Sequence, residues 1–78
     1  MQTDGYQDFL RQVGRRIRAA RRMRGLTQEQ LGERIGTDRV YIGYIEQARR
    51  NASLPTLHAL SKALDVDVSY FFYSDKHE

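Results

Sequence analysis

Apolar residues along this chain recur every three or four positions, and no segment shows the alternation of apolar and polar residues that is typical of a β-strand. Asp4, with Gln7 three residues later, is a possible cap for a first helix. We expect this helix to run to Arg24 and to end at Gly25. Its apolar stripe consists of Phe9 or Leu10, Val13, Ile17 and Ala20. The pattern therefore predicts an all-α fold.

Four shorter apolar segments follow this helix. Thr27 and Asp38 are good N-caps for two of them, and Pro55 suits the start of a third. Gly36 and Asp65 end the periodic patterns that they follow. The apolar positions are Leu31 and Ile35, then Ile42 and Ile45, then Leu57, Leu60, Ala63 and Leu64, and finally Val66, Val68, Phe71 and Phe72. We expect the last and shortest segment to close the core.

The length of 78 residues, with 40% hydrophobic content, allows one small domain over residues 1–78. Its core is expected at about residues 9–73, with short flexible ends. The absence of cysteine excludes disulfides and thiolate metal sites. Neither a signal sequence nor an apolar run of membrane-spanning length is present, so we predict a soluble, cytoplasmic protein.

The positive charge is concentrated in the first third of the chain. Seven arginines and no acidic residue lie between Phe9 and Arg24, whereas residues 51–78 hold two lysines against four acidic residues. The guanidinium group of arginine pairs two N–H groups with phosphate oxygens, so this basic segment suits a phosphate-bearing partner. The alternative is a solvated helix face. Arg21 differs from the other arginines because it lies near the edge of the apolar stripe and needs a partner there.

The spacing around Gly36 is that of a helix-turn-helix. Two short helices joined around a glycine must cross steeply and pack on a third helix. Counted from Gln28 as the first position, Gly32 is fifth, Gly36 is ninth, Ile42 is fifteenth and Ile45 is eighteenth. A small residue, a glycine and two apolar residues at these positions fit a helix-turn-helix that reads DNA.

Three motifs occur in order between Leu26 and Phe72: LTQEQL, G-x-x-x-x-x-I-x-x-I-E and RRNxSLxTLxALxKALxV. In these motifs the chain resembles the Cro and repressor-type (Xre-like) helix-turn-helix family, and its DRVYIGYIE segment is similar to controller proteins of restriction-modification systems. The resemblance implies a compact five-helix domain of the lambda-repressor type. It also implies a transcriptional regulator that binds double-stranded DNA as a homodimer, with the third helix in the major groove over each operator half-site.

The third helix is expected to turn Ile42 and Ile45 inward, so that its other residues face the bases. The predicted base-reading residues are Arg39, Val40, Tyr41, Gly43 and Tyr44. Each has an alternative: a phosphate contact for the arginine, packing on the scaffold for the valine, and an ordinary surface or packing role for the tyrosines. The glycine either lets the backbone approach DNA or makes space for Tyr44.

Phosphate contacts are expected on both sides of this helix. The start of the second helix offers free backbone N–H groups to an anion. The predicted phosphate-binding residues are Thr27, Gln28, Gln47, Arg49, Arg50 and Asn51. The alternative for the residues after the third helix is a generic basic loop. Ala48 stands where relatives usually carry glycine, so a positive φ there would cost strain.

Glu46 and Arg21 resemble the structural ion pair that holds the recognition helix to the first helix in this family. The aromatic residues near the C-terminus supply more apolar surface than one small core buries, and Tyr70, Phe72 and Tyr73 are the predicted dimer interface. The alternative is that Phe71 and Phe72 close the core while the two tyrosines are exposed.

An enzyme is not expected, because the chain has two histidines, no cysteine and no glycine-rich phosphate loop. Neither a cofactor nor a metal is predicted. The competing function is an antitoxin-like protein-binding module of the same fold, which a weak salt dependence of DNA binding would favour. Glu29 or Glu33 would serve to contact RNA polymerase if the protein activates transcription, and the sequence does not select activation over repression.

Overall fold

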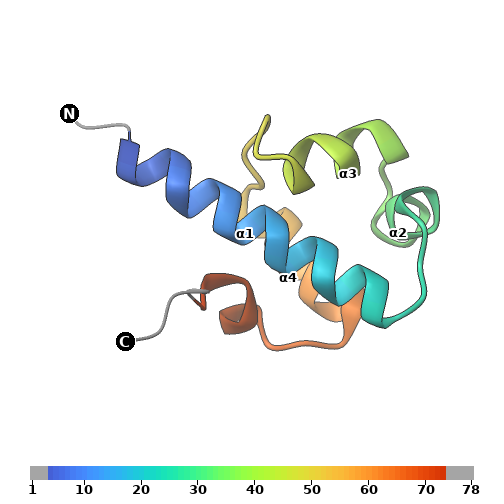
Figure 1. The fold of residues 1–78 in the computed structure, drawn as a ribbon. Helices are drawn as coiled ribbons and strands as arrows, with labels where there is room; N and C mark the ends of the chain where they lie inside the picture. The colour runs from blue at the N-terminus through green and yellow to red at the C-terminus, as the bar shows by residue number, and fades with distance from the viewer. Residues whose placement is uncertain (1–3, 74–78) are drawn as a thin grey trace.

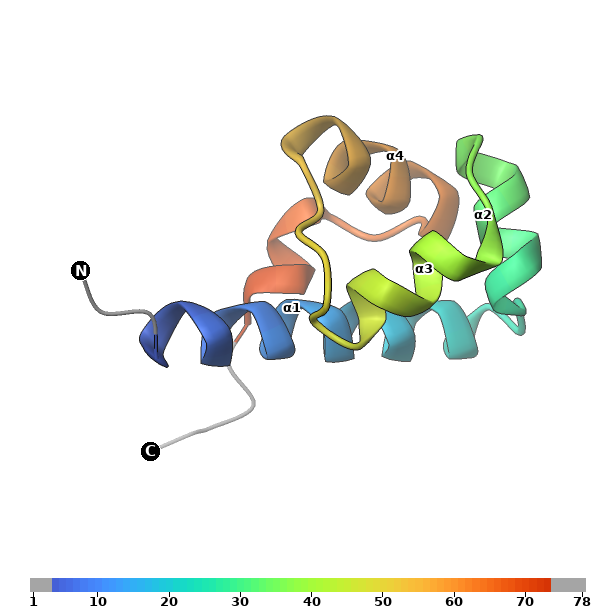
Figure 2. The same ribbon diagram turned by 90° about the horizontal axis from the view of Figure 1, so that it is seen from above.

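The computed structural model describes residues 4–73 and consists there of four α-helices and one 3-10 helix. These elements are α1 (Asp4–Met23), α2 (Gln28–Ile35), α3 (Arg39–Glu46), α4 (Leu54–Leu64) and η1 (Val68–Phe72). Helix α1 is the longest element, and α3 and η1 lie on opposite sides of it (Figure 1). Helix α4 packs on α1, α2 and η1. The view from above shows α4 across from α1, with η1 toward one end of it and α2 toward the other (Figure 2).

The core forms where the apolar stripes of all five elements meet. Its buried residues are Val13, Ile17, Ala20, Leu31, Ile42, Ile45, Leu57, Leu60, Leu64 and Phe71. The stripe expected on the first helix is thus buried from Val13 onward, whereas Phe9 is 43% exposed.

The last element departs from the prediction in two ways. It is a five-residue 3-10 helix, so the expected fifth helix is not an α-helix. Its core contact is also narrower than predicted, since Phe71 is fully buried while Val68 is 38% and Phe72 39% exposed. A 3-10 helix has three residues per turn, so a segment this short directs few side chains to one side.

Local signals set the bounds of the short helices. The Thr27 hydroxyl accepts from the backbone N–H of Gln30, and the Gln30 side chain accepts from the backbone N–H of Thr27, which forms a complete capping box. Asp38 caps α3, because its carboxylate accepts from the backbone N–H of Tyr41, three residues later. Ser53 caps α4, which therefore begins at Leu54, one residue before the proline that marked its start in the sequence.

Two glycines let the helices approach more closely than any side chain permits. A Cβ atom on Gly14 of α1 would lie 2.5 Å from the backbone oxygen of Glu46 at the end of α3. A Cβ atom on Gly32 of α2 would lie 2.9 Å from the backbone carbon of Asp38 in the turn before α3. The position of α3 against both neighbours therefore depends on these small residues.

The flexible ends predicted for the chain fall largely on residues 1–3 and 74–78, which lie outside the described residues. None of the helices between residues 4 and 73 is long and apolar enough to cross a membrane.

Candidate nucleic-acid interface

Helix α3 has one face in the core and one face toward the outside. Ile42 and Ile45 are buried, while Arg39 and Val40 are exposed at the N-terminal end of the helix. Tyr41 and Tyr44 are half-buried, so part of each ring remains accessible. The structure thus places four of the five predicted base-reading residues on an accessible surface.

Gly43 is the exception, and its predicted outward projection is wrong. The residue is buried because the carboxamide of Gln28, from the start of α2, lies over it. A Cβ atom on Gly43 would lie 3.6 Å from Nε2 and 3.7 Å from Oε1 of Gln28. The side chain that covers this point of α3 therefore comes from α2. A hollow of about 220 Å³ extends beside it, lined by Gln28, Arg39, Val40, Gly43, Tyr44, Gln47 and Arg49.

A buried ion pair holds α3 to α1. Nε of Arg21 donates to Oε2 of Glu46 at 2.6 Å, and Nη2 donates to Oε1 at 3.0 Å, while only 8% of Arg21 and 7% of Glu46 is exposed. Nη1 of Arg21 donates to the Leu26 carbonyl, and Nε2 of Gln28 donates to Oε1 of Glu46 at 3.1 Å. Three helices are thus joined through one carboxylate, and a fully paired network of this kind fixes relative orientation.

The segment after α3 turns sharply at Ala48, whose φ of 62° is left-handed. The N–H of Ala48 donates to the carbonyl of Ile45, and the N–H of Arg49 donates to the carbonyl of Tyr44. These two bonds form a Schellman motif, in which the residue at the turn adopts positive φ and is usually glycine. Alanine in this position carries backbone strain, which is the cost that the sequence analysis expected if φ were positive here.

Both arginines after this turn lie against tyrosines of α3. The guanidinium carbon of Arg49 is 5.9 Å from the centre of the Tyr44 ring, and that of Arg50 is 6.0 Å from the centre of the Tyr41 ring. A cation over an aromatic face is attracted by the ring quadrupole. Each of the two tyrosines of the helix is thus brought beside one arginine of the loop.

Asn51 is held by a residue that the sequence did not indicate. Its Oδ1 accepts from the hydroxyl of Tyr6 at 2.6 Å, and its carbonyl accepts from the hydroxyl of Tyr41 at 3.4 Å. Tyr6 lies near the start of α1, 45 residues away along the chain. No local pattern marks a contact over this separation, so inspection of the sequence could not have found it.

The predicted interface residues near the C-terminus form a partly exposed aromatic cluster with α1, in which Phe72 and Tyr73 are exposed and Tyr70 is half-buried. The rings of Phe9 and Phe72 are stacked, with centres 5.9 Å apart. The guanidinium of Arg16 lies over the rings of Tyr70 and Tyr73, and Tyr73 is 58% exposed. Phe9 belongs to this surface, although the sequence analysis named it, or else Leu10, as the first residue of the core stripe.

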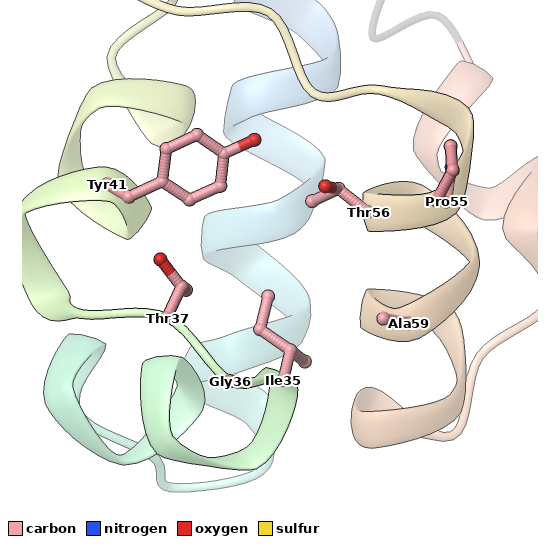
Figure 3. Close-up of a pocket in the computed structure, with 7 residues that line it drawn as sticks. All are labelled: Ile35, Gly36, Thr37, Tyr41, Pro55, Thr56 and Ala59. Atoms are coloured by element: carbon pink, nitrogen blue, oxygen red, sulfur yellow. The ribbon is translucent and has the colours of Figure 1, made fainter.

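A second hollow, of about 360 Å³, opens between the end of α2, the start of α3 and the start of α4 (Figure 3). Its lining residues are Ile35, Gly36, Thr37, Tyr41, Pro55, Thr56 and Ala59. Among residues 4–73, no cluster of three or more histidine, cysteine or acidic side chains is placed to hold a metal ion.

Comparison with known proteins shows the family. A helix-turn-helix family model matches residues 17–71. The immunity repressor protein of Bacillus phage phi105 is 49% identical to this chain over 73% of the residues of this chain. The matched part covers only 40% of the length of that repressor. Control protein C.SmaI of Serratia marcescens is 40% identical, over 81% of this chain and 75% of its own length.

Two solved structures share the fold. The restriction-modification controller protein C.AhdI from Aeromonas hydrophila superposes with a TM-score of 0.77 at 40% identity, over 81% of this chain and 96% of its own. The hypothetical transcription factor NHTF from Neisseria gives a TM-score of 0.82 at 28% identity, over 88% of this chain and 79% of its own. The chain therefore belongs to the Xre-like helix-turn-helix family of DNA-binding transcriptional regulators.

Proposed function

We propose that this protein is a sequence-specific regulator that binds operator half-sites in double-stranded DNA as a homodimer, with α3 in the major groove. The observation that carries the proposal is the two-sided character of α3. Its isoleucines are in the core, while its accessible face adjoins two arginines of the following loop. A helix that packs on one side and offers arginine and tyrosine on the other suits base edges flanked by phosphates.

Base contacts are assigned to the accessible residues of α3. Arg39 is exposed at the helix tip, where a guanidinium can fork onto O6 and N7 of guanine. Val40 is 51% exposed and suits contact with a thymine methyl group. Tyr44 offers its ring edge and hydroxyl farther along the helix, and Tyr41 offers the accessible part of its ring, since its hydroxyl donates to the Asn51 carbonyl. We expect these four side chains to set the preferred sequence.

Phosphate contacts are assigned to both ends of the same surface. At the start of α2 the Thr27 hydroxyl serves the capping box, so we assign the contact there to the backbone N–H groups that lack partners in a first helical turn. Beyond α3 the contacting residues are Gln47, Arg49, Arg50 and Asn51. The ring contacts of both arginines and the Tyr6 bond to Asn51 reduce the ordering that binding requires.

The dimer is assigned to the aromatic cluster around η1. Phe9, Phe72 and Tyr73 are exposed and Tyr70 is half-buried around η1, an element that lies on the side of α1 away from α3 (Figure 1). Two copies joined there by a two-fold axis would leave both reading helices free. Sedimentation equilibrium of a Tyr70→Ala, Tyr73→Ala double variant tests this assignment, and a dimer as tight as the wild type would contradict it.

Control of a restriction-modification system is the regulatory role that we favour within the family. Two relatives are named as control or controller proteins, C.SmaI and C.AhdI, and both match this chain over most of their own length. If the bound protein activates transcription, the exposed Glu29 and Glu33 on α2 are the side chains that we expect to face RNA polymerase.

Selection of bound duplexes from random DNA, with the wild type and with Arg39→Ala, tests the function. We expect the wild type to enrich a two-fold symmetric site and Arg39→Ala to lose one guanine preference in each half-site. Arg18→Ala is the matched control, because it removes the same charge from an exposed position of α1. Affinity should fall steeply with salt, with a slope near −0.9 per neutralised phosphate. No enriched sequence, together with a flat salt response, would favour a protein-binding module instead.

A further inference from the structure

Gln28 takes the place of a side chain that α3 lacks. Gly43 has no Cβ, and the carboxamide of Gln28 lies in van der Waals range of the position where one would stand. Gln28 is only half-buried in this position, so part of its amide group remains accessible. The outer surface of α3 at Gly43 is therefore made by a residue of α2.

The orientation of this amide is set by its partner. A carboxylate oxygen only accepts hydrogen bonds, so the group that faces Oε1 of Glu46 at 3.1 Å must be the nitrogen of Gln28 and not its oxygen. Glu46 is itself fixed by two bonds from Arg21. Oε1 and the second Nε2 hydrogen of Gln28 therefore remain for a ligand, beside the hollow that Arg39, Val40 and Tyr44 also line.

We propose that Gln28 is a specificity-determining residue that reads an adenine in the major groove through the gap left by Gly43. Oε1 would accept from the N6 amino group of the base, and the second Nε2 hydrogen would donate to N7, which is the bidentate pairing of glutamine with adenine. The inference rests on the proposed function, because it adds a reader to the same DNA surface.

The chemistry of the Gln28 amide favours an adenine over the phosphate that the position of Gln28 at the start of α2 suggests. Phosphate oxygens only accept, so a phosphate would use one donor and leave the amide oxygen facing an anion. The adenine edge supplies both a donor and an acceptor. The amide is also already ordered by Glu46, so little side-chain freedom is lost when it pairs with a base.

The test compares sequence preferences, position by position, of the wild type, Gln28→Met and Gly43→Leu. Methionine keeps the length of the side chain but has no amide, and leucine at position 43 displaces the amide from its place over α3. We expect the wild type to prefer adenine at one position of each half-site by roughly 5- to 160-fold. Both variants should lose that preference and keep the others. Glu29→Gln, an exposed neighbour on α2, is the control and should keep every preference.

A modified base provides a second readout. Replacement of that adenine by 7-deazaadenine removes the N7 acceptor, and it should weaken binding of the wild type but leave binding of Gln28→Met unchanged. The inference is overturned if Gln28→Met lowers affinity equally for all sequences, or if its preferences match those of the wild type. If thermal melting shows that Gln28→Met is unfolded, Gly43→Leu decides alone by the same criterion. A wild type that enriches no sequence would instead refute the proposed function.

Discussion

Replacement of Ala48 by glycine should stabilise the protein. The Schellman motif after α3 holds this residue at a φ of 62°, where a Cβ atom costs about 1–2 kcal/mol. Glycine removes that cost, but its greater conformational freedom stabilises the unfolded chain by about 0.5–1 kcal/mol relative to alanine. The midpoints of these two ranges leave a net gain of about 0.75 kcal/mol, which corresponds to a rise in Tm of about 3–6 °C for a domain of this size. Thermal denaturation followed by circular dichroism measures it.

Ala19→Gly is the control for this measurement. It makes the same chemical change at an exposed position inside α1, where the helical backbone favours alanine by about 1 kcal/mol. The two variants should therefore move Tm in opposite directions. A Tm for Ala48→Gly equal to or below that of the wild type would refute the assignment of strain to this turn.

Three further results are expected. Glu46→Gln should lower the free energy of unfolding by about 3–5 kcal/mol in urea titration, because it leaves the buried charge of Arg21 without its counter-ion, and unchanged stability would exclude a structural role for the pair. Gly14→Ala should destabilise the protein by about 1–3 kcal/mol, because the added Cβ would lie 2.5 Å from a backbone oxygen. Gly43→Ala should stabilise it by about 1 kcal/mol, because the nearest atom to its Cβ would be 3.6 Å away. Changes of the same sign for both variants would contradict the packing described. The pKa of Asp67 lies below its ordinary value of 3.8 because a backbone N–H of η1 donates to its carboxylate. This cap therefore stabilises the fold above pH 3.8, and its contribution is lost as pH falls through the lower pKa of the folded state. Asp67→Asn should flatten the acid side of a plot of Tm against pH, and an unchanged plot would assign the acid sensitivity to another group.

The sequence by itself determined where α2 and α3 begin and which apolar residues of α3 are buried. Thr27 and Asp38 cap α2 and α3 as predicted, and Ile42 and Ile45 are buried as their spacing required. These features depend on residues within one or two turns, whose relative positions a helix fixes without any other part of the chain. The left-handed turn at Ala48 was suggested only by the family resemblance, in which this position usually carries glycine.

Tertiary structure alone decided what fills the space between the elements. Gly43 looks outward-facing on α3 until α2 is placed beside it and Gln28 covers it. Tyr6 meets Asn51 because the start of α1 runs past the end of the loop, a contact 45 residues apart that no periodicity encodes. Such contacts follow from the angles and distances at which helices pack, and those are set jointly by the whole core.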